Sequence, residues 1–480
     1  LKCVESAFKQ DHKDEDLSYL FPSALGGSRQ PLTDQGNRNR FLAKYGDDLR
    51  YVPEWGWMLW GDRGWNLIKV EKVRELAEEV VLQLQEEREL VTGKELRKEY
   101  DSWIKYSGSN SGNKNLIELA RQKETVLRSP DQFDTKPTEL ACANGIVDLV
   151  TGEIRGFSRM DLVTKNTGIV YNPNAKSERW EKFLETSTEG DKELQEYLQM
   201  AAGYTATGLN SEECFFVLSG PPASGKSTYM DAILNALGTY ATTSQSEVFM
   251  LRRGKDTALN EIARLAGRRL TSVSEVRQGE KFNDTLIKQI VGGDRVSARF
   301  LYKDTFEFIP QFKLWIATNH DPSSNDAGML RRLKRIRFTH SVPKNQRDPR
   351  LKHAVKNQDQ EAILAWMVEG AMKYLAIGGL KEPKAVRTAV EEYQADQDVA
   401  ANFKEEQLVA SEGSFLNMAD AWTAWATWCK NVNHYPGTRP GFVQMMEDLG
   451  YKLVRNENTD TRGYYGIYVQ APTLSSMPWA

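Results

Sequence analysis

The sequence has few of the residues that cross-link small domains or bind metal ions. Its 480 residues include four cysteines and five histidines, and the cysteines are scattered without a Cys-x-x-Cys pair. None of the histidines has the spacing of a metal-ligand set. This pattern argues against a disulfide framework and a zinc site, and it favours a reducing, cytoplasmic compartment.

Long apolar runs and an excess of one charge are also missing. No run approaches the ~20 residues that cross a bilayer, which predicts a protein without a membrane span. The first residues, Leu1-Lys2-Cys3, have neither an initiator Met nor an apolar segment, as expected for the cut end of a longer chain rather than a signal peptide. With 63 basic and 66 acidic residues the net charge is −3, so any contact with nucleic acid must be a local basic patch.

The order of sequence patterns predicts several domains, and the length alone favours roughly three. Alternating aromatics predict a β-hairpin, helical spacing follows, and a Ser/Gly/Asn-rich stretch predicts a flexible loop. Short apolar runs between Asn-Gly and Thr-Gly turns predict a β meander, and an αα segment precedes a β/α core. In chain order these segments are 51–65, 70–99, 107–113, 140–154 and 179–207, with the β/α core from Cys214 onward.

The last ~80 residues have the order of a winged helix. A Trp-rich helix over Met418–Asn431 precedes a second helix near 440–449 and a strand–turn–strand near 451–469. The tryptophans of the first helix, Trp422, Trp425 and Trp428, are three residues apart, which predicts core packing rather than base stacking. We therefore predict an N-terminal mixed domain, a β meander with a helical collar, an α/β core, a helical connector and a winged-helix-like domain. Their limits are 1–139, 140–208, 209–343, 344–397 and 398–480.

A phosphate-binding loop is the most specific motif. The apolar run Phe215–Ser219 leads into a segment that matches G-x4-G-K-[ST], and a helical pattern follows over Tyr229–Leu237. Glycines let successive N–H groups face the phosphates, and the helix N-terminus adds partial positive charge. Lys226 is expected to reach the β and γ phosphates of ATP, and the Ser227 hydroxyl to bind Mg²⁺. The residues expected to bind the nucleotide are Gly220, Pro221, Pro222, Ala223, Ser224, Gly225, Lys226, Ser227 and Thr228.

Two later strands end in polar residues suited to hydrolysis. The run from Arg269 ends at Ser274-Glu275, and such an acid can orient a water or hold Mg²⁺. Taken in isolation, Glu275 could equally be an ordinary glutamate on an edge strand. Another strand ends at Asn319, where α/β sheets place their ligands. A basic run then includes Arg331 and Arg332, which predicts either an arginine finger or a solvated basic helix.

Motif order resembles that of the superfamily III helicases, and is most similar to the phage/plasmid primase-helicase family that includes the poxvirus helicase-primase. Beyond the motifs above, the resemblance rests on Ala143–Leu149 with Thr151-Gly152, on Ala202–Gly208, and on Ile287–Asp294. Phe306–Pro310 and Thr318-Asn319-His320 complete the set, and the resemblance covers about 40–470.

The resemblance implies an α/β P-loop NTPase with an AAA+-like core, and it implies roles for individual residues. Lys226 and Ser227 become the Walker A pair, Glu275 the Walker B acid and Asn319 sensor 1. The arginine finger is Arg332 or Arg331, with Arg332 the better fit. Many members have two adjacent acids in Walker B, whereas here Ser274 stands in the first position, so separate metal and base roles are in doubt.

A basic hairpin is predicted between the acid-terminated strand and the Asn-terminated strand. Lys288, Arg295, Arg299 and Lys303 lie there, and apolar and basic residues alternate in the segment that holds the last three. The family places its single-stranded DNA contact in this pore region, and phosphate contacts of this kind are tolerant of sequence. The alternative is a surface hairpin with solvated charges. Phe300 or Tyr302 could stack on a base.

The leading hypothesis is an ATP- and Mg²⁺-dependent DNA helicase that forms a ring, expected to be a hexamer, on single-stranded or forked DNA. It would serve a virus, plasmid or mobile element in the host cell, with an upstream primase domain or replication partners. No carboxylate pair for nucleotidyl transfer stands before residue 140, so primase activity is not predicted here. A regulatory or packaging switch that binds ATP without unwinding is the second hypothesis. A small-molecule kinase is disfavoured, because no Arg-rich lid follows an acceptor site.

Overall fold

The computed structural model describes residues 30–251, 258–274, 276–277, 280–300, 305–324, 326–397, 399–432, 434–456 and 460–470. The chain divides into two compact units. The first comprises Leu1–Phe133 with Ser158–Thr164, and the second comprises Asp134–Phe157 with Lys165–Ala480. Among the helices of the described part, none combines the length and the apolar character that a bilayer crossing requires.

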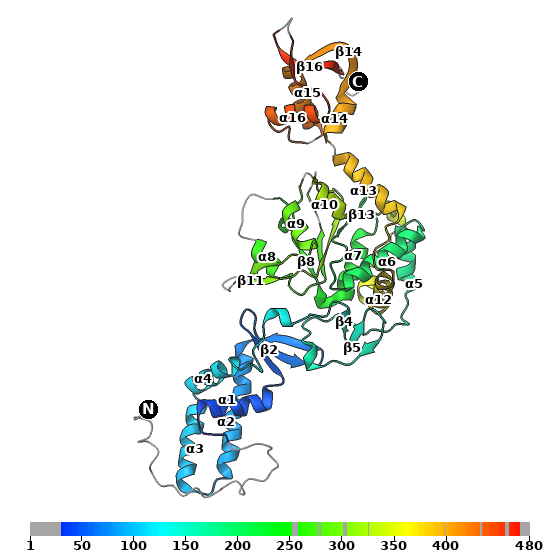
Figure 1. Cartoon of the computed structure of the whole chain (residues 1–480). Helices are drawn as coiled ribbons and strands as arrows, with labels where there is room; N and C mark the ends of the chain where they lie inside the picture. Colours follow the sequence, from blue (N-terminus) through cyan, green and yellow to red (C-terminus); the bar gives the residue numbers. More distant parts are fainter. Residues whose placement is uncertain are drawn as a thin grey trace. The chain divides into compact units, whose positions relative to one another are not determined.

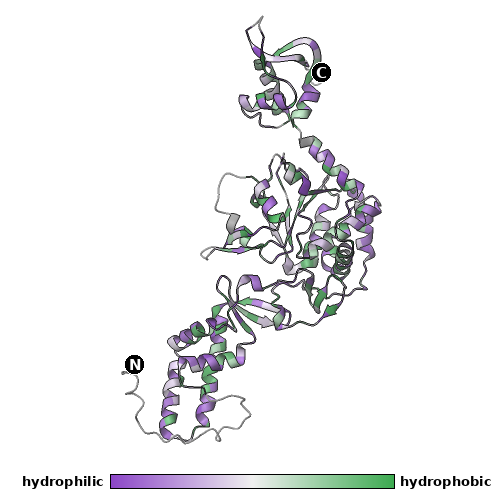
Figure 2. Ribbon diagram, in the orientation of Figure 1, coloured by the Kyte–Doolittle hydropathy of each residue, from purple (hydrophilic) through white to green (hydrophobic). Residues whose placement is uncertain are grey.

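The first unit packs helices around a three-stranded antiparallel sheet. Its longest helix, α2 (Val70–Glu89), buries Val73, Ala77, Val80 and Leu84, which recur at helical spacing on one face. Figure 2 shows the hydrophilic residues that cover the other faces of these helices. The remaining elements are α1 (Asp34–Tyr45), β1 (Leu49–Val52), β2 (Gly56–Gly61), β3 (Gly64–Ile68), α3 (Lys94–Ser107) and α4 (Asn110–Arg121). The predicted hairpin is therefore present, with β1 as a third strand.

The predicted loop over 107–113 is wrong for most of its length. Ser109 caps α4, because its hydroxyl accepts a hydrogen bond from the Gly112 N–H at 3.2 Å. Gly112 lies inside the helix, where a Cβ would stand 2.4 Å from the carbonyl oxygen of Tyr106. The Ser, Gly and Asn residues thus serve as a helix cap and a close helix–helix contact, rather than as a flexible connection.

The second unit begins with the predicted β meander and αα segment. The strands β4, β5 and β6 form an antiparallel sheet, and α6 is almost entirely buried. The elements are β4 (Glu139–Cys142), β5 (Gly145–Asp148), β6 (Ile154–Arg155), α5 (Glu178–Ser187) and α6 (Lys192–Ala206). Burial raises the pKa of the Cys142 thiol to about 12, in keeping with an unreactive core side chain.

A five-stranded parallel sheet forms the centre of this unit (Figure 1). Its order is β13-β7-β12-β9-β8, and each neighbouring pair is parallel. The strands are β7 (Phe215–Ser219), β8 (Ala241–Ser244), β9 (Leu270–Ser274), β12 (Lys313–Thr318) and β13 (Leu333–Arg337). The predicted α/β class is confirmed, and the structure shows that its central sheet is parallel.

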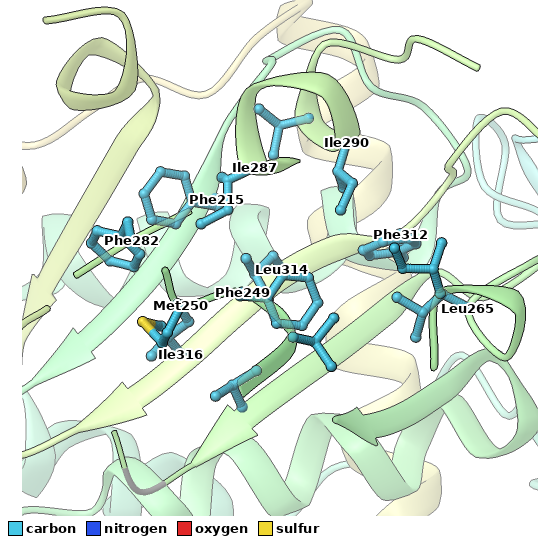
Figure 3. Packing of buried hydrophobic residues seen from close by; sticks show 14 of the residues in the cluster. Phe215, Phe249, Met250, Leu265, Phe282, Ile287, Ile290, Phe312, Leu314 and Ile316 are labelled. Atoms are coloured by element: carbon cyan, nitrogen blue, oxygen red, sulfur yellow. The ribbon is translucent and has the colours of Figure 1, made fainter. Parts of the chain in front are cut away.

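Helices cover both faces of the parallel sheet. On one face, α6, α7 (Lys226–Leu237) and α12 (Gln360–Ile377) pack together, and the ring of Phe216 stacks on that of Trp315 at 4.2 Å. The other face carries the apolar cluster of Figure 3, where Phe215, Leu314 and Ile316 meet Ile287 and Ile290. Further elements of the unit are α8 (Ala258–Ala263), α9 (Asp284–Val291), β10 (Val296–Arg299), β11 (Thr305–Phe308), α10 (Ala327–Arg332), α11 (Leu351–Asn357) and α13 (Lys384–Gln397).

Two buried cations connect the parallel sheet to the segments that precede it. The Arg269 guanidinium donates to the carbonyl oxygens of Ala206 and Glu139, at 2.7 and 2.5 Å. The Lys313 ammonium donates to the carbonyl oxygen of Thr207 at 2.6 Å, and burial holds the pKa of Lys313 well below its usual range. These bonds hold the start of β9 and β12 against α6 and β4.

The C-terminal elements form a small core of their own. Trp425 and Trp428 are buried there against Phe403, which confirms the prediction that the Trp stripe packs in a core. The predicted helices and strands are present, and an additional strand, β14, precedes them. The elements are α14 (Val399–Gln407), β14 (Leu408–Asn417), α15 (Met418–Asn431), α16 (Arg439–Asp448), β15 (Val454–Arg455) and β16 (Arg462–Val469).

Candidate nucleotide site and basic surfaces

The Gly-rich loop joins the end of β7 to the start of α7, as its sequence predicts. Gly220, Ala223 and Gly225 have φ angles of 142°, 61° and 100°. Such left-handed backbone curls the chain back on itself, and α7 begins directly afterwards with Lys226. The loop therefore presents backbone N–H groups and the positive end of a helix dipole, which is a general anion-binding arrangement.

Lys226 lies within this loop and is only 6% exposed. Its Nζ donates to the carbonyl oxygens of Gly220 at 2.7 Å and Pro221 at 2.8 Å, and to Ser224 Oγ at 3.2 Å. Burial lowers the pKa of Lys226. Ser227 and Thr228 follow in the first turn of α7, where the Ser227 side chain is exposed. The cation is thus already held at the loop, while the hydroxyl faces solvent.

The two loop glycines are also required by close packing. A Cβ on Gly220 would lie 2.1 Å from the carbonyl oxygen of Phe338, directly after β13. A Cβ on Gly225 would lie 2.6 Å from Ser187 Oγ, at the end of α5. The loop is therefore wedged between the sheet edge and α5, so its shape is fixed by tertiary contacts as well as by its own sequence.

We predict that Gly220→Ala destabilises the protein by about 2–4 kcal/mol, because the new methyl group meets backbone at a positive φ. Urea unfolding followed by circular dichroism measures this change. Gly156→Ala is the control, since nothing lies within 4 Å of its Cβ position. Equal unfolding midpoints for the two variants would contradict the close packing of Gly220 against the Phe338 carbonyl group.

Asn319 directly follows β12, next to the loop. Thr318 at the end of β12 pairs with Ser219 at the end of β7, so Asn319 lies about one strand spacing, roughly 5 Å, from the first loop glycine. Its side chain is exposed. On the other side of β12, Ser274 pairs with Ala317. Glu275, which follows Ser274, lies outside the described residues, so its predicted role stays a prediction.

The two candidate finger arginines lie at the amino-terminal ends of the sheet strands, whereas the Gly-rich loop lies at their carboxyl ends. Arg331 and Arg332 end α10, and the next residue, Leu333, pairs with Phe215 at the start of β7. The loop begins after Ser219 at the other end of that strand. Four strand steps of about 3.3 Å place the two positions roughly 13 Å apart along the strand direction. Arg331 and Arg332 are thus not brought to the loop of their own chain.

Most cations of the basic run have partners within the chain. Arg332 pairs with Glu213 at 2.8 Å, Lys334 pairs with Glu382, and Arg335 pairs with Asp321 at 2.5 Å. Arg337 pairs with Glu392 on α13. In the described part of the chain, Arg331 is the member of the run without an ion pair, and its side chain is exposed. The acids come from distant segments of the chain, so no local sequence pattern indicates them.

The candidate DNA-binding residues separate into two places. The Lys288 ammonium on α9 pairs with Asp326 at 2.7 Å, and Asp326 caps α10 by accepting from the Met329 N–H at 2.8 Å. Lys288 thus stabilises the helix that carries the arginine pair. Arg299 and Arg295 belong to the predicted hairpin, which the antiparallel pair of β10 and β11 confirms.

The hairpin has one apolar face and one polar face. Val296 and Ala298 are buried, whereas Arg295, Ser297 and Arg299 are exposed. Glu307 lies on the same exposed face, opposite Ser297. Phe300 stacks on Phe306 at 5.7 Å, and the rest of the hairpin tip, with Tyr302 and Lys303, lies outside the described residues. Among the described residues, no group of three or more His, Cys, Asp or Glu side chains could hold a metal ion.

Comparison with known families gives two matches along the chain. A family described as D5 N terminal like matches residues 38–189, and a family of unknown function (DUF5906) matches residues 218–332. The second match contains the Gly-rich loop, Asn319 and the arginine pair, while the first covers most of the N-terminal unit.

Individual relatives are viral. The chain is 28% identical over 344 residues to "Putative helicase L207/L206" of Acanthamoeba polyphaga mimivirus, covering 66% of this chain and 35% of that protein. It is 27% identical over 270 residues to "Putative helicase 022R" of Frog virus 3, covering 52% of this chain and 28% of that protein. The chain thus spans about a third of the length of the curated relatives it matches.

Among solved structures, the A form apo structure of the NrS-1 C terminal region is similar to this chain. The similarity covers 90% of this chain and 99% of the other, with a TM-score of 0.48 and 8% sequence identity.

Proposed function

This chain belongs to the phage and viral primase-helicase family, and from that premise we propose that it is an ATP-dependent DNA helicase. The motor forms a ring, a hexamer, and moves single-stranded DNA through its centre during replication of a virus, plasmid or mobile element. The relatives' names and the arrangement of the Gly-rich loop support this proposal. Because the matched segments cover only about a third of each relative, an upstream primase domain belongs to the same proposal.

ATP is the proposed ligand of the Gly-rich loop. The donors present fit a triphosphate with Mg²⁺: a buried lysine, loop backbone at positive φ, the start of α7 and the exposed Ser227 hydroxyl. Ser227 would hold Mg²⁺, with Glu275 as the proposed acid, and the ion would neutralise charge on the β and γ phosphates. Lys226 exchanges its two loop carbonyl oxygens for phosphate oxygens, and the Asn319 amide holds the attacking water.

The position of the arginine pair is the observation that carries the ring proposal. Arg331 and Arg332 lie at the edge of the sheet away from the loop, so they act on the ATP of a neighbouring copy rather than on their own. A head-to-tail contact between identical subunits brings the loop edge of one copy to the arginine edge of the next. Such heterologous contacts close into rings when the rotation between copies permits.

The exposed face of the β10–β11 hairpin is the proposed DNA track. Arg295 and Arg299 point away from the core on this face, as cations that bind phosphates must. Lys303 at the tip is proposed to join them. Lys288 is a weaker candidate than the sequence indicates, because Asp326 already neutralises it. The DNA backbone, rather than base edges, is therefore the expected target.

We also propose that the core is AAA+-like and that the C-terminal module is a winged helix. The strand order, with the loop strand β7 between β12 and β13, supports the first assignment. The order helix, strand, helix, helix, strand, strand from α14 to β16 supports the second. We further propose that the domains span residues 1–139, 140–208, 209–343, 344–397 and 398–480.

The mass of the protein in solution tests the ring. We expect sedimentation to give 54.5 kDa species without ligands, and a species six times heavier with ATP and single-stranded DNA. A monomer under every condition, with DNA and a non-hydrolysable ATP analogue included, would contradict the proposal.

A further inference from the structure

The N-terminal unit contains a cavity that no part of the proposed motor uses. Its volume is about 360 Å³, and it lies between the β1–β2–β3 sheet and the helices α2 and α4. All of its lining residues belong to the first unit. A volume in this range suits a small ligand or one unit of a polymer.

One wall of the cavity is aromatic. The rings of Tyr51 and Trp57 lie 5.2 Å apart with a 57° tilt, and Trp55 lines the cavity beside them. Trp57 is buried, whereas Tyr51 and Trp55 are partly exposed. Partly exposed rings offer the flat surface on which a base stacks, and such stacking is tolerant of sequence.

Basic residues also line the cavity. Lys114, Glu118 and Arg121 are spaced along one face of α4, and Arg74 reaches the cavity from α2. Arg121 pairs with Glu118 and lies over the Tyr51 ring at 5.6 Å. Within the described ranges, Arg74 and Lys114 form no ion pair, and both side chains are exposed. Two unneutralised cations and an aromatic surface therefore line the same cavity.

We propose that this cavity binds one nucleotide of a single-stranded DNA, with its base on the aromatic wall at Trp55 and its phosphates on Arg74 and Lys114. An aromatic surface beside cations matches a flat base attached to an anion, whereas an acidic peptide would leave the ring surface unused. The choice of a DNA strand over a free nucleotide rests on the proposed helicase function. The site would grip the strand independently of the Gly-rich loop.

The double variant Arg74→Glu/Lys114→Glu tests the site in the full chain. We expect its affinity for a fluorescein-labelled oligothymidylate to fall about tenfold or more, and the salt slope of log K to flatten by roughly 1–2 units. Fluorescence anisotropy at several salt concentrations measures both. The control Lys94→Glu alters an exposed lysine of α3 outside the cavity, and should bind as the wild type does.

Cross-linking tests where the base lies. An oligonucleotide with 4-thiothymidine, irradiated with the full chain, should form an adduct within the tryptic peptide Tyr51–Arg63, which holds the three aromatic residues of the cavity wall. Irradiation with 4-thiothymidine monophosphate in place of the oligonucleotide separates the two sources of the ligand. If the free nucleotide forms this adduct and the oligonucleotide does not, the ligand is a free nucleotide and the DNA assignment is overturned.

The cavity proposal can fail or succeed independently of the proposed ATP-driven motor. ATP hydrolysis without DNA should be the same in Arg74→Glu/Lys114→Glu as in the wild type, which also shows that the variant folds. Wild-type DNA affinity of this variant, together with no adduct in Tyr51–Arg63, would overturn the cavity proposal even if the motor is confirmed. Conversely, loss of affinity and the adduct would stand even if the chain hydrolysed no ATP.

Discussion

Replacement of Lys226 by Ala is expected to abolish ATP hydrolysis, with a loss of about a hundredfold or more. Lys226 is the only charged residue of the Gly-rich loop 220–228. Its Nζ donates to two loop carbonyl oxygens, and we expect it to donate to phosphate oxygens instead when ATP is bound. DNA unwinding should be lost with hydrolysis. A coupled assay of phosphate release and a strand-displacement assay measure the two activities.

The matched control for this variant is Lys352→Ala. Lys352 pairs with Asp231 on α7 at 2.7 Å, but its side chain is 58% exposed, so its loss should cost about 1 kcal/mol of stability or less. Lys226→Ala should still bind single-stranded DNA, because the proposed DNA contacts lie on the β10–β11 hairpin. Hydrolysis by Lys226→Ala at the wild-type rate would remove the basis for the ATP site.

The Gly-rich loop could be predicted because its geometry is local. Nine consecutive residues carry it, and the strand and helix on either side have unmistakable apolar patterns. Asn319 was also predictable, since parallel strands end at one edge of their sheet. What the sequence did not indicate is that Ser187 and Phe338 hold the loop glycines, because they are distant in the chain.

The basic residues were harder to interpret from sequence, because charge alone does not reveal a partner. Lys288 reads as a DNA contact, yet Asp326, 38 residues later, neutralises it. Arg332 reads as a free finger, yet it bonds to Glu213, 119 residues earlier. The prediction of a loop over 107–113 was wrong for a related reason. The composition of this segment suits turns, but the Ser109 hydroxyl caps the start of α4. Tertiary contacts decide these cases, and no local pattern contains them.

Loss of the arginine pair should also reduce ATP hydrolysis strongly. In Arg331→Ala/Arg332→Ala we expect about a thousandfold decrease, the magnitude typical of an arginine finger. The cause is that charge on the transferred phosphoryl group is no longer neutralised by the adjacent subunit. Because the pair lies at the far edge of the sheet, ATP binding itself should remain close to normal. Phosphate release and the affinity for a fluorescent ATP analogue measure the two effects.

Glu213→Gln separates the contributions of the two arginines. It frees Arg332 from its ion pair while leaving the guanidinium in place. If Arg332 is the finger, hydrolysis should persist in Glu213→Gln and fall in Arg332→Ala. If its pairing only supports α10, both variants should be similarly affected, and the exposed Arg331 becomes the finger.

Mixing the two inactive proteins distinguishes action between subunits from action within one. A ring interface that joins the loop of an Arg331→Ala/Arg332→Ala subunit to the arginines of a Lys226→Ala subunit has both groups intact. Random assembly of equal amounts makes about a quarter of the interfaces of this kind, so about a quarter of the wild-type activity should return if the sites act independently. Recovery requires that the loop and the arginines meet across a subunit boundary, because neither chain alone holds a complete site. A mixture that remains inactive, although sedimentation shows mixed rings, would place the missing charge elsewhere and end the assignment of Arg331 and Arg332.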